Sequence, residues 1–261
     1  MMDLGLQGTV ALVTGARGNI GVATCQALAA EGVTVIASDV GVDEGAASTD
    51  GYEWLSLDVT DEANWNRVVA AIESKHGRLD ILVNNAGVAP TDRIDAMPVE
   101  HFRRGFDINV TGVFLGTKAC APLMAKSGAN REGGSALINL ASGAADGPAA
   151  FSACYCATKA AVRMFTRATA VEFSALGYPI RVNSVHPGAV QSDMLSSIVD
   201  RYASLSGMTR EDLETAMLKG HPMGRLVLPP EVADTIVFVA SRAARYTHGD
   251  ALHVDGGHAA M

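Results

Sequence analysis

The sequence has few cysteines, and their spacing offers no common zinc motif. Four occur in 261 residues, and they are Cys25, Cys120, Cys154 and Cys156. No two of them form a C-x-x-C pair, and the seven histidines show no H-E-x-x-H pattern, so we expect no bound metal. Cys154 and Cys156 flank Tyr155, but small side chains packing in a reducing compartment explain them better than a redox pair does.

Positive charge and long apolar runs are also scarce. The net charge is −8 at pH 7, and the fifteen arginines and five lysines are scattered, which argues against nucleic acid as a partner. Residues 1–5 lack the basic and apolar regions of a signal peptide, and we expect no apolar stretch long enough to span a membrane. These features predict a cytoplasmic protein that binds neither nucleic acid nor membrane.

No Pro/Ser-rich linker or charge run divides the chain. With 48% hydrophobic residues it can bury a large core, so we expect one domain over residues 1–261. The 27 glycines suit many tight turns between strands and helices. Gly41, Gly45 and Gly51 interrupt residues 40–52, where we expect a short helix or a loop.

Short apolar runs alternate with helical patterns such as residues 63–76 and 157–176. The seven candidate strands are residues 10–13, 33–36, 54–57, 79–83, 136–140, 180–185 and 251–254. This alternation predicts an α/β fold, a doubly wound and mostly parallel seven-stranded sheet with helices on both faces. Ligands of such a sheet bind at the carboxyl ends of its strands.

Residues 137–159 carry the candidate catalytic chemistry. A buried strand leads to Ser142, and a helical pattern then places Tyr155 and Lys159 at i and i+4, side by side. An ammonium about 5 Å away favours the phenolate by on the order of 3 kcal/mol at an effective dielectric of about 20. Lowering a phenol pKa from 10 to 7 takes roughly 4 kcal/mol, and a cationic cofactor ring would supply the rest. Tyr155 is therefore a candidate general base, with Ser142 bonding the same substrate oxygen.

The first strand ends in T-G-A-R-G-N-I-G, residues 14–21, and a helix follows. Glycines let the backbone approach a phosphate, and the helix N-terminus offers free N–H groups. Asp39 ends the second strand, where a carboxylate accepts both hydroxyls of an adenosine ribose and repels a 2′-phosphate. Val40 offers NADP no positive charge, and solvent exposure explains Arg17 more simply than phosphate binding. We expect NAD.

These motifs occur in order, and over residues 6–257 the chain resembles the short-chain dehydrogenase/reductases. The resemblance implies a catalytic tetrad of Asn109, Ser142, Tyr155 and Lys159, with Asn109 ordering a helix kink. The residues that it implies for the cofactor are Gly15, Asn19, Ile20, Gly21, Asp39, Asp58, Val59, Asn85, Ala86, Gly87, Tyr155, Lys159, Pro187, Gly188, Val190 and Ser192. The family usually has glycine where Asn19 stands. Asparagine best tolerates a positive φ among the other residues, so we expect the turn to form.

The resemblance further implies hydride transfer between NAD(H) and a secondary alcohol or ketone, with Tyr155 as general acid and base. Substrate choice is expected from a lid at residues 189–222, with Met194 and Leu195 nearest the reaction. The facing loop, residues 143–150, has small side chains, and a roomy apolar pocket suits a bulky neutral alcohol. The closing sequence, residues 221–257, is similar to that of bacterial cyclic-alcohol and hydroxysteroid dehydrogenases.

Two other functions stay open. A 3-oxoacyl carrier-protein reductase would need NADPH and a basic docking patch, against which Asp39 and the acidic balance weigh. A non-catalytic NAD-sensing subunit would keep the phosphate loop but usually lose part of the tetrad. Family analogy also implies a homotetramer, since Ala161, Met164 and Phe165 give the Tyr155 helix an apolar outer face.

Overall fold

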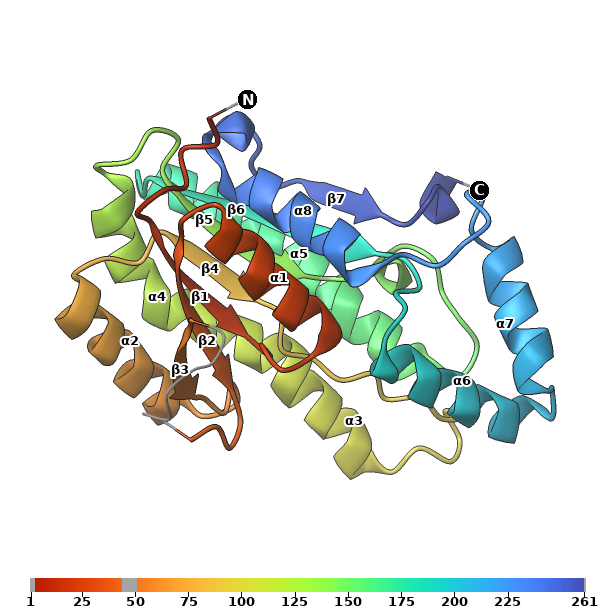
Figure 1. Ribbon diagram of the computed structural model, residues 1–261. Coiled ribbons are helices and arrows are strands. Elements are labelled where there is room, and N and C mark those ends of the chain that lie inside the picture. Colours follow the sequence, from red (N-terminus) through yellow and green to blue (C-terminus); the bar gives the residue numbers. More distant parts are fainter. Residues whose placement is uncertain (1–2, 44–50, 261) are drawn as a thin grey trace.

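Seven parallel strands form one sheet in the computed structural model, which describes residues 3–43 and 51–260 (Figure 1). The strands are β1 (Val10–Thr14), β2 (Thr34–Asp39), β3 (Glu53–Ser56), β4 (Ile81–Asn84), β5 (Ser135–Leu140), β6 (Ile180–Pro187) and β7 (Ala251–Val254). Their order is β3-β2-β1-β4-β5-β6-β7, and each neighbouring pair is parallel. The predicted α/β fold is confirmed, and the sheet is wholly rather than mostly parallel.

Helices cover both faces of this sheet. Helices α1 (Asn19–Ala30) and α8 (Pro229–Ala240) pack together on one face, whereas α2 (Glu62–His76), α4 (Gly112–Gly128) and α5 (Ala153–Ala175) cover the other. Helices α6 (Asp193–Ser206) and α7 (Arg210–Lys219) stand apart, at the right of Figure 1. The chain also forms α3 (Val99–Phe106) and the short turns η1 (Asp107–Thr111), η2 (Gly143–Ala145), η3 (Arg242–Ala244) and η4 (His258–Ala260).

Strand β1 shows how the sheet separates two cores. Ala11 and Val13 belong to the cluster under α1 and α8, whereas Val10 and Leu12 belong to the cluster under α2, α4 and α5. Successive side chains of a strand point to opposite faces, so a strand buried on both faces needs apolar residues at every position. This burial explains why the predicted strands were continuous apolar runs.

The strand order fixes where a ligand can bind. From β1 the chain moves outward through β2 to β3, then returns to place β4 on the other side of β1. The connection after β1 runs toward β2, whereas the connection after β4 runs toward β5 on the opposite side. This divergence opens a crevice outside the carboxyl ends of β1 and β4. Thr14 and Asn84 end these two strands, and the loops that follow them border the crevice.

The predicted element boundaries differ by a few residues. Helix α2 begins one residue before the predicted start, where the Asp61 side chain accepts hydrogen bonds from the backbone N–H groups of Ala63 and Asn64. Helix α5 begins at Ala153, so it includes Tyr155. Residues 40–43 form no helix, and residues 44–50 of the predicted helix or loop lie outside the described residues.

Helices α3 and α4 are continuous through the π-helical turn η1. Together they correct the expectation that no apolar stretch is long enough to span a membrane. The combined helix Val99–Gly128 is long and apolar enough to cross a membrane by length and composition alone. However, 56% of its most apolar window is buried inside the protein. Packing against the sheet therefore accounts for its apolar composition.

Candidate active site

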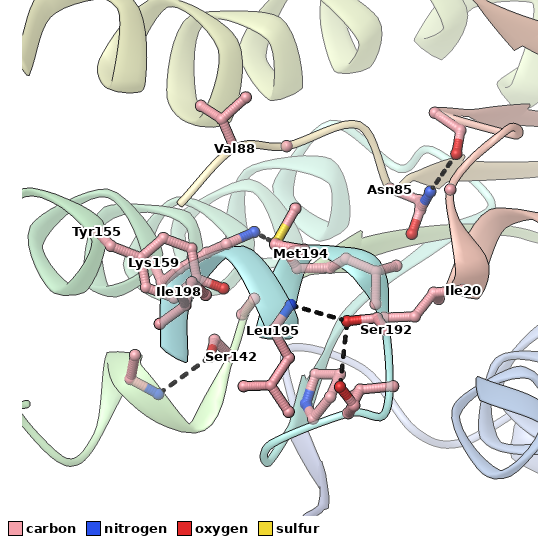
Figure 2. A pocket seen from close by; sticks show the side chains of 18 of the residues that line it. Ile20, Asn85, Val88, Ser142, Tyr155, Lys159, Ser192, Met194, Leu195 and Ile198 are labelled. Carbon is pink, nitrogen blue, oxygen red and sulfur yellow. Dashed lines mark hydrogen bonds between the residues drawn. The ribbon is translucent and has the colours of Figure 1, made fainter. Parts of the chain in front are cut away.

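A cavity of about 1030 Å³ opens at the carboxyl ends of the strands. All of the predicted cofactor residues line it, from Gly15 in the first loop to Ser192 before α6. Of the predicted tetrad, Ser142, Tyr155 and Lys159 line the cavity, whereas Asn109 lies behind its wall. Figure 2 shows part of this lining, with labelled side chains from α1, α5 and α6. Positions far apart in the sequence thus meet at one site.

The phosphate loop depends on two glycines. Gly15 has φ +63°, and a Cβ atom there would lie 2.8 Å from the Cα atom of Ala86. A Cβ atom on Gly21 would lie 2.2 Å from the carbonyl oxygen of Gly15. No side chain caps α1, whose N-cap is Gly18, so its first N–H groups are free to bind an anion.

Asn19 does not adopt the positive φ that we considered for it. It is the first residue of α1, and Gly15 is the loop residue that has the positive φ. The Asn19 side chain instead accepts a hydrogen bond through Oδ1 from the backbone N–H of Asp193, at 3.2 Å. Asp193 begins α6, so this side chain links the phosphate loop to the predicted lid, a contact that the sequence did not predict.

Thr14 and Asn85 fix the loop after β4 against the phosphate loop. The Thr14 hydroxyl oxygen accepts hydrogen bonds from the N–H groups of Asn85 and Ala86, both at 3.0 Å. The Asn85 amide donates to the carbonyl oxygens of Thr14 and Gly15, at 2.8 and 3.0 Å. These bonds hold the backbone around the Gly15 turn in place.

Asp39 ends β2 at the edge of the cavity. Its two carboxylate oxygens accept hydrogen bonds from the backbone N–H groups of Arg17 and Val40, at 3.0 and 2.8 Å. A carboxylate has about four acceptor sites, so two are left for other donors. The exposed Arg17 guanidinium donates to the Val40 carbonyl oxygen at 3.4 Å, which places one cation beside the carboxylate.

Asn109 joins two segments behind the cavity. Its Oδ1 accepts from the Val88 N–H, and its Nδ2 donates to the Val88 carbonyl, both at 2.8 Å. The same Nδ2 donates to the Thr158 hydroxyl at 3.0 Å. Asn109 lies in the π-helical turn η1, which agrees with the expected irregularity in this helix. It positions the helix of Tyr155 and does not line the cavity itself.

Lys159 and Tyr155 lie on one face of α5, as their spacing predicted. The Lys159 ammonium nitrogen lies 5.8 Å from the centre of the Tyr155 ring and donates a 2.7 Å hydrogen bond to the Leu140 carbonyl, at the end of β5. Ser142 follows two residues later, and its Oγ accepts from the Ala144 N–H at 3.1 Å. Burial lowers the pKa of Lys159 to about 8.

The balance of charges around Tyr155 differs from our expectation. Burial raises the pKa of its hydroxyl above the usual value, and a hydrogen bond with Ser142 opposes that rise only in part. The Lys159 ammonium, bonded to the Leu140 carbonyl, does not reverse the direction. The chain's own groups therefore favour the neutral phenol, and a cation bound beside Tyr155 would be needed to stabilise the phenolate.

Helices α6 and α7 cover the other side of the cavity. The six largest apolar or aromatic side chains of the predicted lid that line it are Met194, Leu195, Ile198, Tyr202, Leu213 and Met217. Val199 is instead buried outside the cavity lining, and Met208 and Leu218 are exposed. Met194 and Leu195 line the cavity, as predicted. The apolar pattern alone did not distinguish the side chains that line the cavity from those that are buried elsewhere or exposed.

The small-residue loop after Ser142 lies against this lid. Gly143, Ala144, Gly147 and Ala149 line the cavity, which leaves it wide. The Tyr202 hydroxyl bonds the Ser152 hydroxyl at 2.7 Å and also donates to the Ala150 carbonyl oxygen. Side-chain hydrogen bonds thus hold α6 to the loop.

His221 is a functional-site residue that sequence reasoning missed. It is buried at the cavity wall, and its Nε2 accepts from the Ala189 N–H at 3.1 Å. Its Nδ1 must donate to the Met217 carbonyl oxygen at 2.7 Å, because a carbonyl can only accept. A neutral imidazole thus ties the end of α7 to the loop after β6, and no motif in the sequence marks it.

Comparison with known proteins agrees with this geometry. Residues 15–259 match the family described as Enoyl-(Acyl carrier protein) reductase. The cyclopentanol dehydrogenase of Comamonas testosteroni is 37% identical over 260 residues, covering 96% of this chain and 97% of that protein. The 3-alpha-(or 20-beta)-hydroxysteroid dehydrogenase of Mycobacterium tuberculosis is 35% identical over 258 residues, covering 97% and 90%.

A solved structure shows the same similarity in three dimensions. The 3-ketoacyl-(acyl-carrier-protein) reductase from Brucella melitensis, complexed with NADH, has a TM-score of 0.82 and 32% identity. The alignment covers 97% of this chain and 99% of that chain. Since each of these matches extends over nearly the whole chain, the protein belongs to the short-chain dehydrogenase/reductase family, oxidoreductases whose fold binds a nicotinamide cofactor.

Proposed function

We propose that the protein is an NAD-dependent dehydrogenase of bulky, mostly apolar secondary alcohols, of the cyclic-alcohol or hydroxysteroid type, and reduces the corresponding ketones. One observation carries the substrate class. The cavity beside Ser142 and Tyr155 has a lid of apolar and aromatic side chains on one side and a loop of glycine and alanine on the other. Such a pocket favours a large neutral ring over a charged or heavily hydroxylated molecule.

The first half of the cavity fits a dinucleotide. Gly15 and Gly21 leave room where any Cβ atom would clash, and the uncapped start of α1 offers N–H groups to a pyrophosphate. Asp39 has acceptor sites for the ribose hydroxyls of NAD, and its negative charge opposes the 2′-phosphate of NADP. When bound, the nicotinamide accepts or returns the hydride.

The chain's own residues handle the proton. In oxidation, the phenolate of Tyr155, which the positive charge of a bound nicotinamide would stabilise, takes the proton of the substrate hydroxyl while Ser142 holds the same oxygen by a hydrogen bond. Lys159 and Asn109 help to position Tyr155 and Ser142. Lys159 donates a hydrogen bond to the Leu140 carbonyl, and Asn109 is hydrogen-bonded to Thr158 and Val88. Burial raises the pKa of Tyr155, so the neutral phenol is also suited to donate its proton in ketone reduction.

The names of two relatives support the substrate class. The Comamonas testosteroni relative is a cyclopentanol dehydrogenase and the Mycobacterium tuberculosis relative is a hydroxysteroid dehydrogenase, and both names describe alcohols on rings. We propose the same substrate class for this chain. The small-residue loop and the wide cavity leave room for a fused ring system, so we expect steroidal as well as simple cyclic alcohols to be accepted.

A panel of alcohols tests the proposal. We expect reduction of NAD, followed by the absorbance of NADH, to be fastest with cyclic and steroidal alcohols and at least about 10-fold slower with sugar alcohols of similar size. NADP should be the poorer coenzyme by kcat/KM. A preference for sugar alcohols would contradict the substrate class. Reduction of a 3-oxoacyl thioester with NADPH, faster than any alcohol oxidation, would favour the carrier-protein alternative.

We also propose that the protein assembles as a homotetramer in the cytoplasm. On the outer face of α5, Met164 and Val171 are 60% and 72% exposed, and their spacing of seven residues places them on the same side of the helix. Phe165 contributes less to this face than the sequence suggested, because it packs on Val113, Ala141 and Val162. Light scattering at micromolar concentration should give four times the chain mass, and a monomer would refute the assembly.

A further inference from the structure

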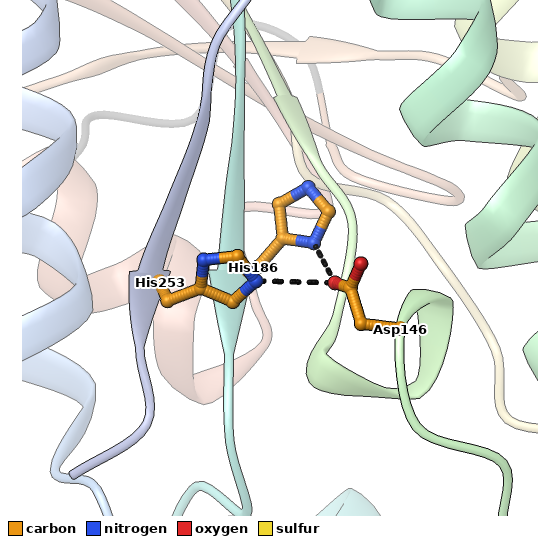
Figure 3. A group of neighbouring side chains, drawn as sticks. All are labelled: Asp146, His186 and His253. Carbon is orange, nitrogen blue, oxygen red and sulfur yellow. Dashed lines mark hydrogen bonds and ion pairs between the residues drawn. The ribbon is translucent and has the colours of Figure 1, made fainter. Parts of the chain in front are cut away.

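Three side chains far apart in the sequence meet next to the active site (Figure 3). Asp146 follows η2 in the small-residue loop, His186 lies on β6, and His253 lies on β7. One carboxylate oxygen of Asp146 lies 3.1 Å from Nδ1 of His186 and 3.1 Å from Nε2 of His253. All three ligand atoms lie within 4.8 Å of one another, and none of the three residues lines the active-site cavity.

We propose that Asp146, His186 and His253 form a binding site for a divalent transition metal ion, with Zn²⁺ as the expected occupant. Two imidazole nitrogens and one carboxylate oxygen are a ligand set that zinc uses, with a fourth position left for water. Such a site departs from our expectation that the chain binds no metal. That expectation rested on short sequence motifs. Asp146 and His186 are 40 positions apart, and His186 and His253 are 67 positions apart, so these ligands form no short motif.

The surroundings of two of the ligands suit metal binding. A metal-bound histidine needs a partner for its other ring nitrogen, and Nε2 of His186 lies 2.8 Å from the Ser184 hydroxyl. That hydroxyl also lies 3.3 Å from the Asp250 carbonyl, so it can donate to Asp250 and accept from His186. The Nδ1 lone pair then points at Asp146. The second carboxylate oxygen of Asp146 is held by the Arg163 guanidinium.

Exposure gives a metal ion a path to the site. The His186 side chain is fully buried, whereas the Asp146 and His253 side chains are 18% and 32% exposed. An ion can therefore reach the cluster from the His253 side without unfolding β6. The bound ion would join the loop that follows Ser142 to β6 and β7, close to the Pro187–Gly188 turn that lines the cavity. We assign it a stabilising role on the substrate side of the site.

The Arg163 guanidinium weakens metal binding at the cluster. Its positive charge pairs with the carboxylate that the ion needs, so the guanidinium and the ion repel each other while sharing Asp146. Replacing Arg163 by an uncharged side chain of similar length should therefore tighten metal binding. If the cluster were only a network of hydrogen bonds and ion pairs, the same change would create no metal affinity.

Direct metal titration tests the site. Chelator-treated protein should bind one equivalent of Zn²⁺ in competition with a chromophoric chelator, and Co²⁺ should give the visible absorption of a four-coordinate ion. His253→Ala and Asp146→Asn should each weaken Zn²⁺ binding by more than about 100-fold, since even outer partners of metal ligands contribute about 10- to 100-fold. Arg163→Met should bind Zn²⁺ more tightly than the wild type. One equivalent of Zn²⁺ should also raise the Tm of the wild type but not of Asp146→Asn.

His101→Ala is the matched control. His101 is an exposed histidine of α3, outside the cluster, so its loss should leave the stoichiometry and affinity unchanged. Far-ultraviolet circular dichroism and NADH binding confirm that each variant folds. The proposal fails if the wild type binds no stoichiometric metal, or if His253→Ala and Asp146→Asn bind it as tightly as the wild type. Because binding is read without any substrate, neither result depends on the proposed enzyme activity.

Discussion

The two halves of the cavity are built in different ways. In the dinucleotide half, backbone meets backbone: a Cβ atom on Gly15 or Gly21 would overlap main-chain atoms of the neighbouring loop. In the lid half, side chains make the contacts, such as Tyr202 with Ser152 and Arg201 with Asp92. The first half accepts only glycine at defined positions, whereas the second tolerates many arrangements of apolar and polar residues.

This difference explains what each half contributes. Backbone contacts fix one ligand, whose phosphates and ribose are the same in every reaction cycle. Side-chain contacts with partly exposed residues can be replaced singly, so the lid can be adapted to different substrates. Only Val199 of α6 is fully buried, and most of the lid's ion pairs lie at the surface, where each stabilises by about 0–1 kcal/mol. The lid should therefore be the less stable half.

Two tyrosines, one at the junction of the halves and one in the lid, give the largest predicted contrast. Tyr155→Phe should lower kcat/KM by about 1000-fold, because general acid–base catalysis contributes roughly 100- to 10,000-fold. NADH affinity should change far less than kcat/KM. Oxidation by the wild type should accelerate with rising pH, since burial raises the pKa of Tyr155, and the variant should lose that dependence.

Tyr202→Phe is the control for that variant. It also removes a phenolic hydroxyl, but from α6. The loss of its hydrogen bonds should lower the free energy of unfolding by about 1 kcal/mol and change KM by less than about 10-fold. Equal losses of kcat/KM in the two variants would show that Tyr155 has no special role. A Tyr155→Phe enzyme with most of its turnover would remove the assignment of the general base.

Much of the dinucleotide half could be predicted from the sequence, because its constraints are local. Gly15, Gly21 and Asp39 each sit at a fixed distance from the end of a strand, and strand ends are marked by apolar runs. Tyr155 and Lys159 are four residues apart on one helix, so their proximity follows from helical geometry. These positions needed no knowledge of which strands are neighbours.

The rest depended on contacts that only the folded chain creates. His221 bonds Ala189 across 32 positions, and Asn19 bonds Asp193 across 174, with nothing in either local sequence to pair them. The direction of the Tyr155 pKa shift was also beyond local reasoning. Burial raises the pKa of Tyr155 and a hydrogen bond with Ser142 lowers it, and neither effect is visible in the i, i+4 spacing.

Matched glycine substitutions sharpen the comparison at a smaller scale. Gly21→Ala should weaken NADH binding by about 10- to 100-fold, because overpacking at a rigid contact costs about 1–3 kcal/mol.

Gly207 provides the matched control. It ends α6 with φ +76°, and a Cβ atom there would meet no other atom within 4 Å. Gly207→Ala should therefore cost about 1 kcal/mol of stability and leave NADH binding unchanged. Fluorescence titration with NADH measures the first effect, and thermal unfolding measures the second. Equal effects on NADH binding would mean that the two halves are not built differently.

The smallest predicted effect concerns Asn19, which connects the halves. Asn19→Gly restores the glycine usual in the family but removes the acceptor for the Asp193 N–H, which starts α6. Because this hydrogen bond is exposed, we expect substrate KM to rise only about 2- to 5-fold, with NADH affinity unchanged within about 2-fold. Asn19→Ala separates the causes, since it removes the acceptor without adding the backbone freedom of glycine. If KM rises equally in both variants, the lost contact with α6 is responsible. If only Asn19→Gly changes, and through NADH affinity, the residue acts on the phosphate loop alone and does not couple it to the lid.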